Sequence, residues 1–94
     1  MGEKRFSKEE LIRVRNQVSI NEVIEHIVDL PCKKCEGQLR FVCPVCSEHN
    51  TATNPKTNLA RCFRCQRNFN PIDMIMVVRG ADFVEAVKYL KGYL

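Results

Sequence analysis

The chain has 94 residues, 45% of them hydrophobic, with 15 Lys and Arg residues against 11 Asp and Glu. This length suits one small domain, whose modest core is expected to need a staple such as disulfides or a metal ion. No apolar run approaches the roughly 20 residues that a membrane helix requires, and residues 1–10 are too polar for a signal peptide. We therefore expect a cytoplasmic protein without a membrane partner, whose reduced cysteines favour metal binding over disulfides.

Residues 7–30 have the pattern of two short helices. Ser7 and Glu10 have the spacing of a capping box, in which each side chain bonds the other residue's backbone N–H, and Ser19 and Glu22 repeat it. Apolar residues follow each box at helical spacing. Pro31 is expected to end the second helix because it disfavours helical geometry in the preceding residue.

The helical period is lost over residues 32–69. A short β-prone run at 39–42 leads into a cysteine pair, residues 51–53 suit a second strand, and residues 59–61 lead into another cysteine pair. Residues 54–58 are rich in turn formers. We expect a small antiparallel sheet of about three strands here.

Helical patterning returns over residues 71–94. Pro71 suits a first helical turn, and the nearly continuous apolar run that follows predicts a largely buried helix. Gly80 is expected to end this helix, and Asp82 to cap another. The predicted fold is α+β: a zinc-ribbon sheet (32–69) between N-terminal (7–30) and C-terminal (71–94) helix pairs, with residues 1–94 as one domain.

Two Cys-x-x-Cys pairs, separated by fifteen residues, predict a zinc site formed by Cys43, Cys46, Cys62 and Cys65. Two residues between ligands let one tight turn present both sulfurs to the same ion, and two such turns complete a tetrahedron. Four protein ligands leave no open position for substrate, so a single structural Zn²⁺ is expected.

A third pair, Cys32 and Cys35, leaves alternatives open. These thiols could replace one of the other pairs, bind a second ion with His49 or His26, or be idle. A redox role is a further alternative, although Cys-Lys-Lys-Cys lacks the βαβ context of a thioredoxin-like motif.

The positive charge is concentrated around the cysteines. Residues 31–67 hold seven basic and two acidic residues, whereas the flanks hold eight basic and nine acidic residues. Four thiolates around one Zn²⁺ sum to −2, which weakens the local positive field. A cationic patch still attracts polyanions, nucleic acid first, although a basic surface can also serve solubility alone.

The order of these motifs resembles the zinc-binding domain of bacterial-type DNA primases from about residue 6 to residue 94. The most specific matches are Val-Cys-Pro-Val-Cys at 42–46, Arg-Cys-Phe-Arg-Cys at 61–65, and the segment from Ile-Asp at 72–73 through Gly80 to Glu-Ala-Val-Lys-Tyr-Leu at 85–90. The sequence departs from the family at Cys46, where histidine is usual, in the run 47–53, and in the absent Gly-Gly-Asp after the last cysteine.

The resemblance implies binding of a single-stranded DNA template during primer synthesis, with a primase catalytic domain or a replicative helicase as partner. Phe41 or Phe63 could stack on a base, although Phe41, beside Val42, is expected to be a core residue, and Phe63 suits the core and the surface equally. The candidates to neutralise phosphates are the basic residues Arg40, Lys56, Arg61, Arg64 and Arg67. No catalytic constellation is present, so an enzymatic activity would need a separate domain. The alternative function is a regulatory or protein-interaction zinc ribbon that docks on a partner through its helices, for example through apolar residues Ile75, Met76 and Val78.

Overall fold

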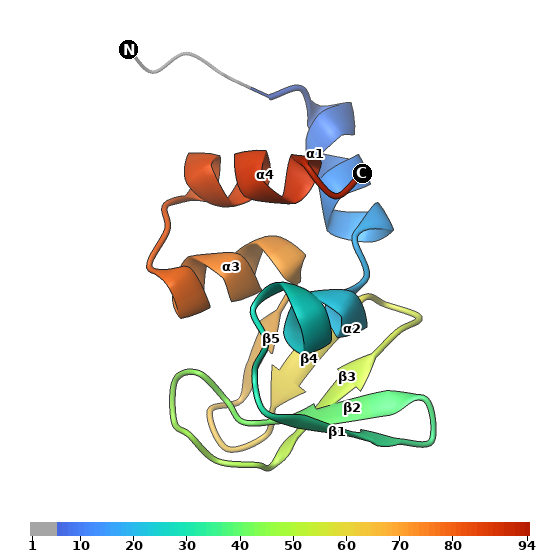
Figure 1. The fold of residues 1–94 in the computed structure, drawn as a ribbon, viewed down its shortest axis with the longest axis vertical. Coiled ribbons are helices and arrows are strands. Elements are labelled where there is room, and N and C mark those ends of the chain that lie inside the picture. The colour runs from blue at the N-terminus through green and yellow to red at the C-terminus, as the bar shows by residue number, and fades with distance from the viewer. Residues whose placement is uncertain (1–5) are drawn as a thin grey trace.

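A computed structural model describes residues 6–94; residues 1–5, counted above in the domain and in the polar N-terminal stretch, lie outside the described part. Helices form one end of this part and strands the other (Figure 1). The elements, in chain order, are α1 (Lys8–Gln17), α2 (Ile20–Glu22), the π-helical η1 (Val23–Ile27), β1 (Cys32–Cys35), β2 (Gln38–Phe41), β3 (Thr51–Asn54), β4 (Leu59–Cys62), β5 (Arg67–Phe69), α3 (Pro71–Arg79) and α4 (Phe83–Lys91). Within residues 6–94, no helix has the length and apolar character needed to cross a membrane.

The N-terminal helix pair forms as expected, with one difference in its caps. The Ser7 hydroxyl accepts the Glu10 N–H at 3.1 Å, and the Glu10 carboxylate accepts the Ser7 N–H at 3.0 Å. Ser19 caps α2 at 3.3 Å, but the Glu22 carboxylate lies 3.3 Å from His26 Nδ1, an exposed i,i+4 pair. The second helix is not ended by Pro31 as expected. It ends earlier, in a π-helical turn at Ile27, and is followed by Asp29 with a left-handed φ of 53°.

The C-terminal helices also begin and end at the predicted residues. Pro71 is the first residue of α3, whose N-cap Asn70 forms a complete capping box with Asp73. Gly80 ends α3 with a φ of 65°, a conformation that glycine adopts without a steric cost. Asp82 caps α4 and completes a capping box with Glu85.

The α+β class is confirmed, with two antiparallel sheets: β1–β2 and β3–β4–β5. The three segments predicted as strands correspond to β2, β3 and β4. The strands β1 and β5 were not predicted. Strand β5 is only three residues long and pairs with β4, with Phe69 opposite Ala60.

Threonine side chains join the two sheets where β2 lies beside β3. The hydroxyls of Thr53 and Thr51 accept the backbone N–H groups of Leu39 and Phe41, each at 2.8 Å. The Thr51 hydroxyl also donates to the carbonyl of Phe41. Both threonines are buried, and these bonds satisfy polar groups that burial would otherwise leave unpaired.

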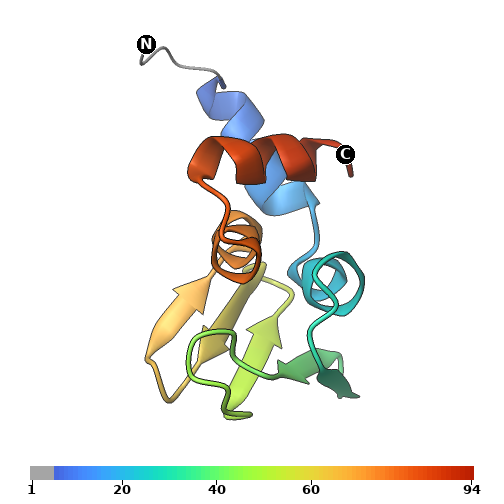
Figure 2. The ribbon, with the colours of Figure 1, turned by 60° about the vertical axis from the view of Figure 1, so that its left-hand side comes forward.

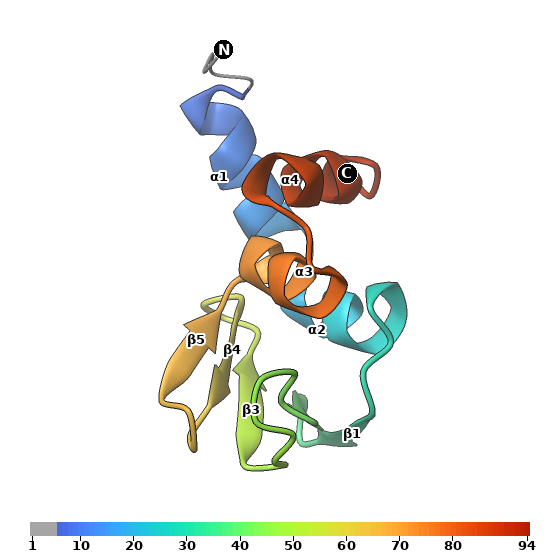
Figure 3. The same ribbon diagram turned by 90° about the vertical axis from the view of Figure 1, so that its left-hand side faces the viewer.

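One hydrophobic core connects the helices to the inner faces of the strands. Helix α3 contacts α1, α4, η1 and β5, and Figures 2 and 3 show it lying between α4 and the strands. The largest fully buried side chains come from every layer: Phe41, Phe69, Ile20, Ile24, Leu39, Met74, Ile75, Leu90, Val14, Val23 and Val87. Phe41 is thus a core residue, as its position beside Val42 predicted.

Candidate metal centre and sheet surface

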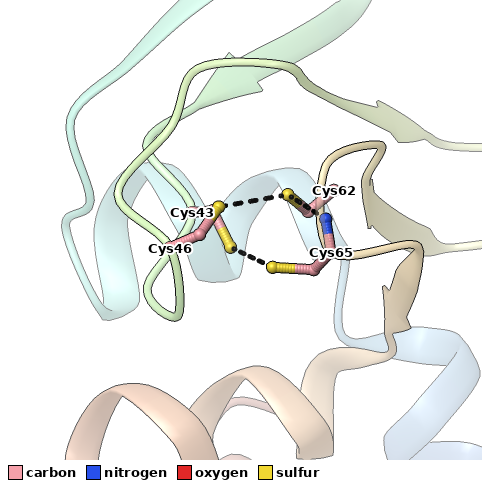
Figure 4. Close-up of side chains that lie close together, drawn as sticks. All are labelled: Cys43, Cys46, Cys62 and Cys65. Carbon is pink, nitrogen blue, oxygen red and sulfur yellow. Dashed lines mark hydrogen bonds between the residues drawn. The ribbon is translucent and has the colours of Figure 1, made fainter.

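The structure brings together the four cysteines that the sequence spacing selected. Cys43 and Cys46 lie on the loop after β2, Cys62 ends β4, and Cys65 lies in the turn before β5. Figure 4 shows the two loops facing each other with all four sulfurs turned inward. These sulfur atoms all lie within 4.8 Å of one another.

The sulfur separations fit a tetrahedral zinc ion. The Sγ atoms of Cys43 and Cys65 are 3.9 Å apart, and those of Cys46 and Cys62 are 3.6 Å apart. A tetrahedron with Zn–S bonds of about 2.3 Å has edges of about 3.8 Å. Four thiols in this arrangement would complete the coordination shell of one Zn²⁺, which would supply cross-linking and no open position for chemistry.

Each cysteine pair sits on the same kind of backbone turn. The residue after each second cysteine has a left-handed conformation, with a φ of 64° at Ser47 and 56° at Gln66. Backbone N–H groups point at the first sulfur of each pair: Val45 to Cys43 and Cys65 to Cys62, both at 3.4 Å. Such donors stabilise a thiolate, so both turns are prepared for a metal.

The thiols differ in how readily they ionise in the metal-free site. Burial opposes ionisation of Cys62, but hydrogen bonds from the Cys65 N–H and from the Cys46 and Cys43 thiols outweigh it and lower the Cys62 pKa to about 7. Hydrogen bonding to Cys46, followed by burial, raises the Cys65 pKa to about 12. Cys62 is therefore ionised more readily than Cys65.

The remaining pair, Cys32 and Cys35, lies outside this site. Both thiols are exposed on strand β1, and positions three apart on a strand point to opposite faces. This placement opposes their joint binding of one ion and a disulfide between them. Among the described residues, the four-cysteine cluster is the one group of three or more metal-binding side chains, and neither His26 nor His49 belongs to it.

The outer face of β3–β4–β5 carries the most specific of the predicted nucleic-acid contacts. Arg61 and Phe63 share this face, with the guanidinium carbon 5.7 Å from the ring centroid. Asn68, opposite Arg61 in the ladder, accepts an N–H from the guanidinium at 3.1 Å. The Phe63 ring is 48% exposed, although its backbone N–H is fixed to the Asn50 carbonyl at 2.9 Å. The sequence left Phe63 undecided between core and surface, and it did not single out Asn68.

The other basic candidates do not gather on this face. Arg64 is exposed in the turn between Cys62 and Cys65. Arg67 pairs with Cys62, so its side chain starts on the opposite face and packs over Phe69 at 4.9 Å. Lys56 is in the β3–β4 turn, at the end of the hairpin away from the cysteines. Arg40 pairs with Lys33 across the separate β1–β2 hairpin.

Two facing cysteine turns, a small antiparallel sheet and flanking helices together define a zinc ribbon with a closed, structural metal site. The sequence profile of the CHC2 zinc finger, the zinc ribbon of DnaG-type primases, matches residues 6–93, and the chain belongs to this family. The expected resemblance to primase zinc-binding domains is therefore confirmed. The comparison with curated proteins gave no match.

The family and the geometry of the four cysteines both indicate a structural zinc site. It is a primase-type module with one zinc site and is not itself a catalytic centre. Cys46 stands where the family usually has histidine, and its sulfur lies within the cluster. Thiolate and imidazole both serve tetrahedral zinc, so the exchange keeps the site closed.

Proposed function

We propose that this zinc ribbon binds single-stranded DNA template during primer synthesis, and that residues 1–94 act as one domain in the cytoplasm. The observation that carries the proposal is the Arg61–Phe63 pair on the outer face of the sheet. An exposed aromatic ring offers a stacking platform for any base, and a guanidinium beside it reaches the adjacent phosphate. No metal chemistry is needed, because zinc only fixes the turn on which Phe63 lies.

The other basic residues contribute according to their distance from this pair. Arg64 follows Phe63 directly and is the best placed to contact the next phosphate along the strand. Arg67, Arg40 and Lys56 lie off the outer face and act mainly through their long-range field, which salt screens. The combined charge attracts the strand, whereas Arg61 and Phe63 fix its position.

The partners proposed are a primase catalytic domain or a replicative helicase, which would use the bound template. The alternative, docking through an apolar helical surface, loses part of its basis. Ile75 is fully buried in the core, and Met76 and Val78 are partly buried against it. These three residues therefore do not form the exposed apolar surface that the alternative required.

The test compares two exposed phenylalanines in the zinc-loaded chain. Phe63→Ala should weaken binding of a fluorescent single-stranded oligonucleotide on the order of tenfold, since stacking contributes about 1–3 kcal/mol per base. Phe83→Ala is the matched control, because Phe83 is 43% exposed but lies on α4. Anisotropy titrations should show a loss for the first variant only. Equal affinities for both variants, or no DNA binding by the parent chain at low salt, would overturn the proposal.

A further inference from the structure

A concave surface lies beside the β1–β2 hairpin, apart from the Arg61–Phe63 face. It is a cleft of about 520 Å³, within the size range of small-molecule sites. The hairpin and the loop after it supply its walls, formed by Pro31, Cys32, Lys33, Arg40, Val42 and His49. Three of these six residues carry basic side chains, and none is acidic.

The strand register holds the side chains of Lys33 and Arg40 next to each other. Lys33 lies directly opposite Arg40 in the antiparallel ladder, so both side chains project from the same face of the hairpin. Like charges at facing positions are destabilising. Among the described residues, neither side chain takes part in an ion pair that would offset this repulsion. A bound anion would offset it.

The charges around the cleft also indicate where an anion would lie. The pKa of Cys32 is raised first by burial and then by the carboxylates of Glu25 and Asp29. These acids make the Cys32 side of the cleft unfavourable for an anion. The Lys33–Arg40 wall is the favourable side, and the His49 ring, which also lines the cleft, offers a further hydrogen-bonding group.

We propose that this cleft is a binding site for the phosphates of a nucleotide, held by Lys33 and Arg40. The guanidinium of Arg40 presents a fork of N–H donors that matches phosphate oxygens, and the Lys33 ammonium adds a point charge. The phosphates belong to either a free nucleoside triphosphate or the phosphorylated 5′ end of a strand. The site goes beyond the template surface and does not depend on it, because the residues differ from Arg61 and Phe63.

The adjacent lysines of β1 provide a matched test. Lys34 pairs with Leu39, so it projects from the face opposite to Lys33 while carrying the same charge. In calorimetric titrations of the zinc-loaded chain with ATP and with inorganic triphosphate, Lys33→Ala and Arg40→Ala should each weaken binding on the order of tenfold, as for loss of a charged hydrogen bond. Lys34→Ala should have the small effect of an equal loss of net charge.

Oligonucleotides distinguish the two sources of phosphate. If the ligand is a strand end, a 5′-phosphorylated oligonucleotide should bind more tightly than its 5′-hydroxyl counterpart, and Arg40→Ala should remove that difference. Phe63→Ala should weaken both oligonucleotides equally and leave ATP binding unchanged. These experiments thus distinguish a wrong proposal for the cleft from a wrong proposal for the template surface.

If Lys33→Ala and Arg40→Ala match Lys34→Ala for every probe, the proposed phosphate site is wrong.

Discussion

Replacing Asn58 with alanine should destabilise the domain more than replacing a turn residue whose side chain makes only local bonds. Asn58 lies in the β3–β4 turn, yet its side chain bonds the junction between α1 and α2. Its Oδ1 accepts the Ile20 N–H at 2.8 Å. Its Nδ2 donates to the carbonyls of Arg15 at 2.7 Å and Val18 at 2.9 Å. One amide thus joins the end of α1 and the start of α2 to the sheet.

The size of the effect follows from these bonds and from the backbone. Three hydrogen bonds at a net value of about 1 kcal/mol each give roughly 3 kcal/mol. Asn58 also has a left-handed φ of 58°. Asparagine tolerates this conformation better than alanine, which adds about 1 kcal/mol. Asn58→Gly loses the same bonds without the steric strain, so it should be less destabilising than Asn58→Ala.

The measurement is urea unfolding of the zinc-saturated chain, followed by circular dichroism at one fixed zinc concentration. Asn54→Ala is the control, because the Asn54 side chain accepts only a local bond, from the Lys56 N–H at 3.0 Å. The expected difference of roughly 3 kcal/mol between the variants would separate their midpoints by about 1–3 M, since the slope m is about 1–3 kcal/mol/M in urea. If Asn58→Ala and Asn54→Ala unfold at the same urea concentration, the three bonds do not hold the helices to the sheet.

Four further predictions concern the metal centre and a helix end. Zinc binding at pH 7 should release about half a proton fewer than four protonated thiols would, because Cys62 with its pKa of about 7 is already about half ionised; calorimetry in buffers of different ionisation enthalpy measures the number of protons released. In the metal-free chain, the lowered Cys62 pKa stabilises the fold above pH 9, and this contribution is lost as the pH falls through 7. The raised Cys65 pKa of about 12 stabilises the fold below pH 9, and this contribution is lost as the pH rises towards 12. A free energy of unfolding that does not change with pH would contradict both pKa shifts. Cys46→His should retain one metal ion, and the cobalt-substituted protein should show weaker sulfur charge-transfer absorption; loss of metal would show that the site requires four thiolates. Gly80→Ala should cost about 1 kcal/mol through its φ of 65° alone, because an added Cβ meets no atom within 4 Å, and a thermal unfolding midpoint equal to that of the parent would refute this.

The features that the sequence predicted best are those whose signals lie within a few residues. The Ser7–Glu10 capping box needs only four consecutive residues and the N-cap at Asp82 only one, and both form. The zinc cluster is also encoded locally, since each turn presents its own sulfur pair. Only the approach of the two pairs requires the rest of the fold.

The features that were missed depend on pairing between distant segments. Cys32 and Cys35 have the spacing of a metal turn, but pairing with residues 38–41 makes the segment a strand and points the thiols apart. Register likewise separates Arg61 from Arg67, six residues apart in the sequence, onto opposite faces of one sheet. The sequence pattern showed the basic residues but not the strand register, which decides the face of the sheet on which each side chain lies.

The threonine joint between the sheets has a consequence for how the domain opens. Two hydroxyls, and no continuous backbone ladder, attach the β1–β2 hairpin to β3. Breaking these contacts and withdrawing Leu39 and Phe41 from the core would release the hairpin and leave the pairings β3–β4 and β4–β5 unchanged. We therefore expect the hairpin to open as a separate cooperative unit, with an opening free energy set by the threonine hydrogen bonds and by the burial of Leu39 and Phe41. In hydrogen exchange, the amides of Leu39 and Phe41 would report this local equilibrium, whereas those of β4 would report loss of the zinc-bound sheet.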